Sequence, residues 1–158
     1  MVKLIPMEQI DFEAYCERAI IEYADDKVRN GNWTAEEAPE RSRVEFQHYL
    51  PDGLQSKDQF IFSITEESSG QKLGILWVNV KSDTPDHPAF IYDFIIEEQF
   101  RGKGFGRQAL MALDEKLLSM AAKSVGLHVF GDNIIAQELY KKAGYMVTNI
   151  NMKKTLKK

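Results

Sequence analysis

A glycine-rich turn between an apolar run and a helical pattern is the feature that most constrains the fold of this chain. The turn reads QFRGKGFGRQAL over residues 99–110. The run before it, AFIYDFII at 89–96, has the length and composition of a buried strand. After the turn, apolar residues recur at helical spacing from 110 to 121. We therefore expect a strand that ends in a tight turn from which a helix begins directly.

The chemistry of this turn suits an anionic ligand. A helix that begins inside a turn exposes backbone N–H groups at the positive end of its dipole, and glycine lets a ligand approach them closely. The cations around the turn are Arg101, Lys103 and Arg107. This combination predicts a diphosphate site, with an ordinary turn and solvated charges as the alternative. The Walker A pattern is absent, and Arg107 stands where the dinucleotide fingerprint needs its third glycine.

Apolar periodicity predicts further strands along the chain. Residues that alternate between apolar and polar types over a few positions are typical of half-buried strands. The C-terminal segment YMVTNINMKKTL, residues 145–156, is expected to form one or two strands. The other expected strands lie at 2–5, 60–64, 73–80 and 124–130.

Helical periodicity and capping residues predict two helices in the N-terminal third and a shorter one near the C-terminus. The first begins at Asp11 as its cap and ends at the segment RNGNW. The second opens with the capping box Thr34-Ala35-Glu36-Glu37 and runs to about Leu50. The last follows the capping segment GDN at 131–133 and ends at Gly144, a common residue after a helix C-terminus.

The element order β-α-α-β-β-β-α-β-α-β predicts an α/β fold. We expect a mixed, mostly antiparallel sheet of six to seven strands with helices on both faces, in a single domain, 1–158. The formal net charge of −4 disfavours a nucleic-acid-binding protein. The single Cys16 excludes a disulfide framework and a multi-thiolate zinc site. Without a signal-peptide or membrane-span pattern, a cytoplasmic protein with no membrane or nucleic-acid partner is expected.

Two motifs resemble signatures of the GCN5-related N-acetyltransferase (GNAT) superfamily. Arg101-x-x-Gly104-x-Gly106 resembles its Arg/Gln-x-x-Gly-x-Gly/Ala motif. The segment LHVFGDNIIAQELYKKAGY resembles its second signature, Asn-x-x-Ala-x-x-Leu-Tyr-x-Lys-x-Gly-Phe/Tyr. The matching residues are Asn133, Ala136, Leu139, Tyr140, Lys142, Gly144 and Tyr145. The motif region spans about 90–146, and Glu98 departs from the proline that many members carry before the Arg/Gln.

The resemblance implies acetyl-CoA as co-substrate and no metal. The turn and the helix N-terminus after it would bind the pyrophosphate of acetyl-CoA. The fourth strand of the family carries a bulge and splays from the fifth, and its free backbone groups would pair with the pantetheine arm. The implied cofactor-binding residues are Phe94, Ile95, Ile96, Arg101, Gly102, Lys103, Gly104, Phe105, Gly106, Arg107, Asn133, Ala136 and Lys142.

The resemblance further implies direct transfer of the acetyl group to a primary amine in a ternary complex. Tyr140 is the expected acid for the departing thiolate, because a phenol holds its proton at neutral pH; core packing is its alternative role. His128 is the expected base, and a histidine packed in the sheet or turned away is the alternative. Asp93 and Glu97 are further candidates for the base or for acceptor binding. Asp93 lies in an apolar run and would need a partner if buried.

The N-terminal helices are expected to bind the acceptor through Glu22, Tyr23 and Trp33. An acidic, aromatic rim suits a cationic acceptor, such as a small-molecule amine, a lysine or a peptide N-terminus, whereas solvated helix charges are the alternative. Two other functions stay open: a non-catalytic CoA-binding regulatory or interaction domain, and a transferase of another acyl group. The resemblance also leaves open a homodimer paired through the C-terminal strands.

Overall fold

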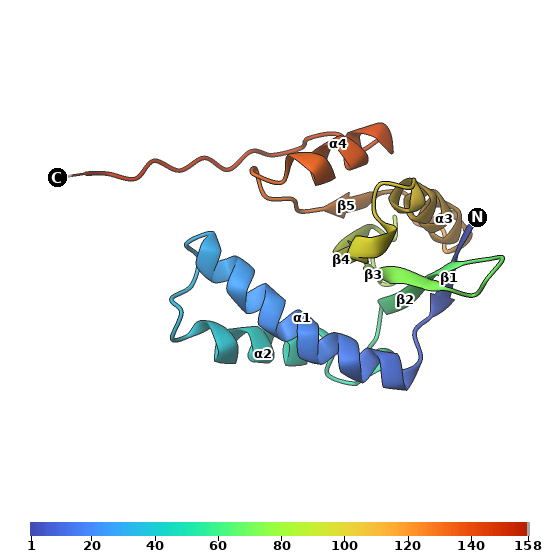
Figure 1. Cartoon of the computed structure of the whole chain (residues 1–158), viewed down its shortest axis with the longest axis horizontal. Helices are drawn as coiled ribbons and strands as arrows, with labels where there is room; N and C mark the ends of the chain where they lie inside the picture. The colour runs from blue at the N-terminus through green and yellow to red at the C-terminus, as the bar shows by residue number, and fades with distance from the viewer. Residues whose placement is uncertain (158) are drawn as a thin grey trace.

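A five-stranded sheet with helices on both faces forms the body of the protein, described for residues 1–157 by a computed structural model (Figure 1). The strands are β1 (Val2–Pro6), β2 (Gln59–Glu66), β3 (Lys72–Val80), β4 (Ala89–Ile96) and β5 (Val125–Leu127). They lie side by side in this order. The first four are antiparallel to their neighbours, and β5 pairs with β4 in parallel. The predicted mixed, mostly antiparallel sheet is confirmed.

The helices form one layer on each side of the sheet, with α1 and α2 on one face and α3 and α4 on the other (Figure 1). Their bounds are α1 (Gln9–Arg29), α2 (Ala38–Tyr49), α3 (Phe105–Ser119) and α4 (Ile134–Lys142). Two short 3-10 helices, η1 (Gly53–Gln55) and η2 (Glu98–Phe100), precede β2 and the glycine-rich turn. The predicted helices on both faces are therefore present.

Two of the predicted helix starts are wrong by a few residues. Asp11 does not cap α1, because the helix already begins at Gln9; its carboxylate forms an ion pair with Lys72 instead. Before α2, Thr34 Oγ1 accepts a hydrogen bond from the Glu37 N–H at 3.3 Å, as in a capping box. Continuous helix nevertheless begins only at Ala38, after a turn. Local capping chemistry thus marked the vicinity of each start but not its position.

Strand alternation divides the apolar side chains between two cores. The core beneath α3 contains Ile64, Leu76, Val78, Leu110 and Leu113. The core beneath α1 and α2 contains Phe12, Tyr15, Ile61, Ile75 and Trp77. Burying a large apolar side chain stabilises a fold by about 1.5–3 kcal/mol, so both faces of the sheet hold their helices firmly.

A bulge in β4 interrupts this alternation. Trp77 of β3 lies opposite Asp93, but the next residue, Val78, lies opposite Ile91, so Tyr92 is an extra residue. The bulge places two successive side chains, those of Tyr92 and Asp93, on the α1 and α2 face, where they contact Trp77 and Tyr15. The β4 side chains that pack on the α3 core are Ala89, Ile91, Phe94 and Ile96.

Beyond the bulge, β4 has no partner on the β5 side. The two strands pair only through Ala89–Ile91 and Val125–Leu127. From there to Ile96, β4 remains paired with β3 alone among the described strands. The predicted splay between these strands is present and exposes a backbone edge of β4.

The C-terminal segment differs from prediction. Residues 143–157 form no strand with any described part of the chain, so the sheet has five strands rather than six to seven, and the element order ends at α4. This segment runs away from the body (Figure 1). Ala143 and Tyr145 still pack on the core beneath α3, but from residue 146 on the apolar side chains are exposed, with Met146 at 85% and Met152 at 91%. Alternation alone does not make a strand, because a strand also needs a neighbouring edge for its hydrogen bonds.

The end of α4 follows the prediction. Gly144 has a φ of +98° and its N–H donates to the Lys141 carbonyl, while the Tyr145 N–H donates to the Tyr140 carbonyl. These two bonds form a Schellman motif, in which glycine adopts the left-handed conformation after the helix. The motif fixes where Tyr140 and Tyr145 lie relative to each other.

Gly74 allows β3 and β4 to approach closely at the end of β4. A Cβ atom at this position would lie 1.9 Å from the carbonyl oxygen of Ile95. Because the two backbones would have to separate, we expect Gly74→Ala to lower the free energy of unfolding by about 1–3 kcal/mol in urea denaturation. Gly126→Ala is the matched control, since its nearest heavy atom, in Phe90, lies 3.6 Å away. Equal losses in the two variants would contradict this account.

Candidate functional site

A cavity of about 270 Å³ opens where β4 and β5 diverge; we call it the splay cavity. Residues 91–94 of β4 form one wall, and residues 127–130 at the end of β5 form another. Asn133, Ala136 and Tyr140 of α4 close it, with Asp26 of α1 at its edge. Because part of the β4 edge has no strand partner, an extended ligand in this cavity can add to the sheet as a strand would.

Tyr140 presents a protonated phenol to the splay cavity. Its ring lies beside Phe94 of β4, with centroids 6.3 Å apart. Burial, and secondarily the charge of Asp93, raise the pKa of Tyr140 to about 12. The phenol therefore keeps its proton across the neutral range and can donate a hydrogen bond to an anion that forms nearby.

Asn133 organises the α4 wall of the cavity. It is the N-cap of α4, and its side-chain oxygen accepts a hydrogen bond from the Ala136 N–H at 3.2 Å. This bond satisfies one of the N–H groups that a helix leaves without a partner in its first turn. Asn133 of the second signature thus has a structural role: it stabilises the first turn of α4, which lies against the splay cavity.

The glycine-rich turn has the geometry of an anion site. Gly104, at φ +85°, is the N-cap of α3, and its carbonyl accepts the first helical hydrogen bond from the Gln108 N–H. The N–H groups of residues 105–107 therefore precede the helical hydrogen bonds. A Cβ atom at Gly102 or Gly104 would meet no heavy atom of the described chain within 4 Å, so the space beside the backbone is open.

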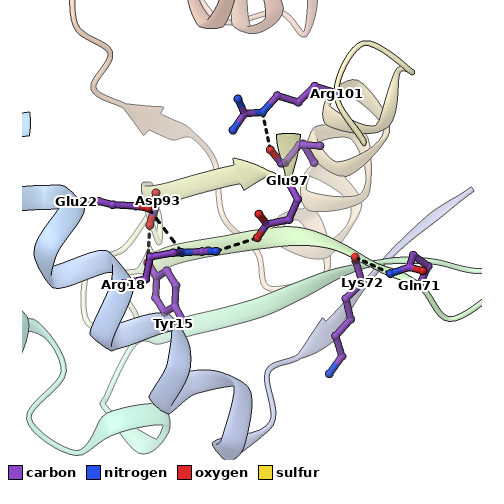
Figure 2. Close-up of polar contacts among 9 residues, drawn as sticks. Tyr15, Arg18, Glu22, Gln71, Lys72, Asp93, Glu97 and Arg101 are labelled. Atoms are coloured by element: carbon purple, nitrogen blue, oxygen red, sulfur yellow. Dashed lines mark hydrogen bonds and ion pairs between the residues drawn. The ribbon is translucent and has the colours of Figure 1, made fainter. Parts of the chain in front are cut away.

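The cations of the turn have different surroundings. Arg101 Nε donates to the Ile96 carbonyl at 2.7 Å and so ties the turn to the end of β4 (Figure 2). Lys103 and Arg107 are exposed at the start of α3, where the helix dipole also favours an anion. Lys142 is exposed at the other end of α4. The turn therefore combines an arginine that is bound to the β4 backbone with two exposed positive charges.

A second cavity, of about 390 Å³, lies between α1, α2 and β4; we call it the aromatic cavity. It adjoins the splay cavity, because both are lined by Asp26, Ile91, Tyr92, Asp93, His128 and Phe130. The exposed His128 ring packs edge-on against Phe130, with centroids 4.9 Å apart. The titratable side chains at the junction of the two cavities are thus Asp26, Tyr92, Asp93 and His128.

Asp93 has an internal partner in α1. The Tyr15 hydroxyl donates to Asp93 Oδ2 at 2.6 Å (Figure 2). Burial raises the pKa of Asp93 above its ordinary value, and the hydrogen bond from Tyr15 partly opposes this shift. Burial and the Asp93 charge also raise the pKa of Tyr15 well above its usual value, so Tyr15 remains the donor.

The other expected acceptor-binding residues divide into two groups. Glu22 and Tyr23 line the aromatic cavity together with Asp93. Trp33 lines neither cavity: it is buried against Tyr23, with Lys27 and Arg41 over its ring. Glu97 also lines neither cavity, and it accepts a hydrogen bond from Arg18 at 3.1 Å (Figure 2).

Sequence reasoning missed most of the aromatic wall. The additional lining residues that could contact a ligand are Asp26, Glu45, Phe46, Tyr49, Trp77, Tyr92 and Phe130. Their positions along the chain are far apart, and no spacing rule connects them. The only available signal was the density of aromatic residues in the segments at α2, β3 and β4.

Three further observations bear on the chemistry. Burial raises the pKa of Cys16 to about 11, and this side chain packs against the α1 core. Among residues 1–157, no three His, Cys, Asp or Glu side chains are grouped so that they could hold a metal ion. Within the same residues, no helix combines the length and apolar character needed to cross a membrane.

Asp93→Asn should stabilise the fold at neutral pH. Because the folded-state pKa of Asp93 lies above its ordinary value, ionisation of this carboxyl destabilises the protein, and the penalty disappears as the pH falls below that ordinary value. Asparagine keeps an acceptor for the Tyr15 hydroxyl. We expect a higher Tm at pH 7, with the difference shrinking in acid. Exposed Asp83→Asn is the control, and a lower Tm of Asp93→Asn at pH 7 would contradict this view.

Sequence comparison matches residues 20–145 to the Acetyltransferase (GNAT) family. Two Bacillus subtilis (strain 168) proteins, named as uncharacterized N-acetyltransferases, are similar over nearly their full length. YdgE is 37% identical over 150 residues, which are 95% of each chain. YycN is 36% identical over 155 residues, which are 98% of this chain and 99% of YycN.

Solved structures agree with this similarity. A crystal structure of the Bacillus subtilis acetyltransferase YycN superimposes with a TM-score of 0.93, at 35% identity and covering 100% of both chains. AAC(6')-Iy, solved with a bisubstrate analog of CoA and acetylneamine, shares the fold at a TM-score of 0.61 and 13% identity, over 99% of both chains. This protein is therefore an acetyltransferase that belongs to the GNAT family.

Proposed function

We propose that the protein is an acetyl-CoA-dependent N-acetyltransferase that transfers the acetyl group directly to a primary amine in a ternary complex. The observation that carries this proposal is the junction of the two cavities at Asp93 and His128, with Tyr140 in the wall of the splay cavity. One cavity would hold the thioester and the other the amine, so that donor and acceptor meet without an enzyme-bound acyl intermediate. Membership in the GNAT family supports acetyl-CoA as the donor.

The cofactor-binding residues expected from the sequence fit this donor. Its pyrophosphate would accept from the N–H groups at the start of α3, beside the open backbone of Gly102 and Gly104. Its pantetheine arm would pair with the edge of β4 over Phe94–Ile96, which has no strand partner and where Arg101 already binds the Ile96 carbonyl. The remaining residues proposed to bind it are Arg101, Lys103, Phe105, Gly106, Arg107, Asn133, Ala136 and Lys142.

The proposed chemistry assigns deprotonation of the amine to His128 and protonation of the thiolate to Tyr140. His128 removes a proton from the ammonium group, and the free amine attacks the acetyl carbonyl carbon, whose oxygen is polarised by the β4 backbone near Ile95 or Ile96. The new C–N bond forms as the C–S bond breaks. Tyr140 gives its proton to the departing thiolate and is reprotonated by the second proton, which the nitrogen loses as the amide forms. The products are an N-acetylated amine and CoA.

Tyr140→Phe tests the proposed acid. We expect kcat to fall by about 100-fold, because a general acid contributes at least that much, while the Kd for acetyl-CoA changes little. Thiol release measures the first quantity, and calorimetry the second. Tyr145→Phe is the matched control, since this neighbouring hydroxyl, with centroids 5.7 Å apart, has no hydrogen-bond partner among the described residues. Full turnover by Tyr140→Phe would remove Tyr140 as the acid.

We also propose that the C-terminal segment pairs two copies of the chain. Between residues 146 and 156, four apolar residues stand at even positions, as on one side of an extended strand, and Val147 is the apolar exception at an odd position. The four are Met146, Ile150, Met152 and Leu156. Ile150 is 76% exposed, although a side chain of this kind is usually buried. The outer edge of β5 has no partner among the described strands. If residues 146–156 of one copy paired with the β5 edge of another, the exposed apolar side chains would be buried and the edge would gain a hydrogen-bonded strand.

Pairing of two copies through residues 146–156 is tested in solution with charged variants of the full chain. We expect the native protein to be a dimer by light scattering, and Ile150→Asp with Met152→Asp to be a folded monomer. Asn149→Asp with Asn151→Asp, on the other side of the alternation, adds equal charge and should remain dimeric. A monomeric native chain, or dissociation by the control pair as well, would overturn the proposal.

A further inference from the structure

The aromatic cavity has a continuous wall of tilted and edge-packed rings. Ring centroids lie 5.7 Å apart for Phe46 and Trp77, and 5.0 Å apart for Trp77 and Tyr92. Tyr49 joins this wall at 5.0 Å from Tyr92, and Tyr23 at 6.0 Å from Phe46. These rings come from α1, α2, β3 and β4, so only the folded chain assembles them. Such a wall offers a ligand a large apolar surface and ring faces that attract a cation.

Carboxylates exceed cations around the same cavity. Its lining contains Glu22, Asp26, Glu45 and Asp93, and one cation, Lys27, among the described residues. Arg18 and Arg29, which are not in the lining, pair with Glu22 at 3.8 Å and with Asp26 at 2.9 Å. This leaves two carboxylates of the lining, Glu45 and Asp93, for one lining cation, Lys27. The Lys27 Nζ lies over the Tyr23 ring at 5.4 Å. The cavity therefore attracts a positively charged ligand.

Two polar groups at the aromatic wall are already occupied within the protein. Trp77 Nε1 donates to Gln59 Oε1 at 2.7 Å, and Asp93 already accepts from Tyr15. A ligand hydroxyl placed against either of these groups would lose its bonds to water and find the partner taken, which is costly. An apolar ligand body meets no such penalty.

We propose that the acceptor is a small primary ammonium joined by a short linker to an aromatic or similar apolar body. The apolar body would lie against Trp77, Tyr92 and Tyr49, with the nitrogen at the cavity junction near Asp93 and His128. This inference rests on the proposed function and names its substrate class. The reaction keeps the balance given above: a C–N bond replaces the C–S bond, one ammonium proton passes to His128, Tyr140 protonates the thiolate, and the second nitrogen proton restores Tyr140.

An amine panel tests the substrate class directly. The native protein is mixed with acetyl-CoA and phenethylamine, spermidine, glucosamine or a short peptide with a free N-terminus, and thiol release is followed. We expect kcat/KM for phenethylamine to exceed that for each other amine by about tenfold or more. Equal or better turnover of spermidine, glucosamine or the peptide would overturn the inference while leaving the proposed function intact.

Two variants test the residues of the cavity. Tyr49→Leu removes a ring face but keeps an apolar side chain, and should raise KM for phenethylamine by about 3- to 10-fold with kcat little changed. Glu45→Gln should also raise KM by weakening attraction of the ammonium. Glu40→Gln is its matched control, because Glu40 lies on the same helix, outside the cavity lining, and pairs with Arg43. Unchanged KM in both Tyr49→Leu and Glu45→Gln would overturn the placement of the acceptor.

A binding measurement separates failure of this inference from failure of the proposed function. The chain has two tryptophans, Trp33 and Trp77, and only Trp77 lines the aromatic cavity. In Trp33→Phe, tryptophan emission reports phenethylammonium binding at Trp77 without acetyl-CoA. A saturable change, with no thiol release from any amine, would support the ligand class and overturn the proposed function. The absence of any saturable change would overturn the inference itself.

Discussion

The single extra residue in β4 is the constraint on which the site depends. In an uninterrupted strand, Asp93 would follow Tyr92 onto the opposite face and enter the leucine-rich core beneath α3, where an unpaired carboxylate is very costly. The bulge keeps Asp93 on the α1 face, within reach of the Tyr15 hydroxyl, and returns Phe94 to the α3 core. A bulge also bends its strand, which accords with the loss of pairing between β4 and β5 beyond Ile91. One insertion therefore accompanies both the cavity and its acidic side chain.

The arrangement places a destabilising charge at the junction of the two cavities. Burial makes ionised Asp93 unfavourable, and Tyr15 compensates only in part. Buried carboxylates of this kind are common at functional sites, because a poorly solvated carboxylate interacts strongly with a cation that replaces its water. The negative charge of Asp93 also acts on Tyr140. It adds to the effect of burial in raising the pKa of the Tyr140 phenol. The proposed acid, Tyr140, and the buried carboxylate of Asp93 therefore interact electrostatically across the cavity where the reaction is proposed to occur.

The features that were predictable from the sequence are local ones. Alternation over a few residues located β2 and β3, and the glycines at positions 102–106 located the start of α3. Gly144 ended α4 as expected, since its φ of +98° suits glycine. The start of α1 was misplaced at Asp11, because a capping residue is only favoured at a helix start and can equally pair with a cation from a distant strand, here Lys72. Trp33 was expected at the site because sequence cannot tell a buried ring from a ring in a cavity wall.

By itself, the sequence determined the spacing of its two family motifs, the run of glycines and cations in the turn before α3, and the position of Tyr140 in the second motif. These depend on neighbours along the chain, whose geometry the backbone fixes. Only the tertiary structure decided that Tyr49 meets Tyr92, that Tyr15 holds Asp93, and that residues 146–157 find no partner strand in their own subunit. Those outcomes depend on how α1 and α2 dock on the bulged sheet, and docking is set by packing between segments that share no local pattern.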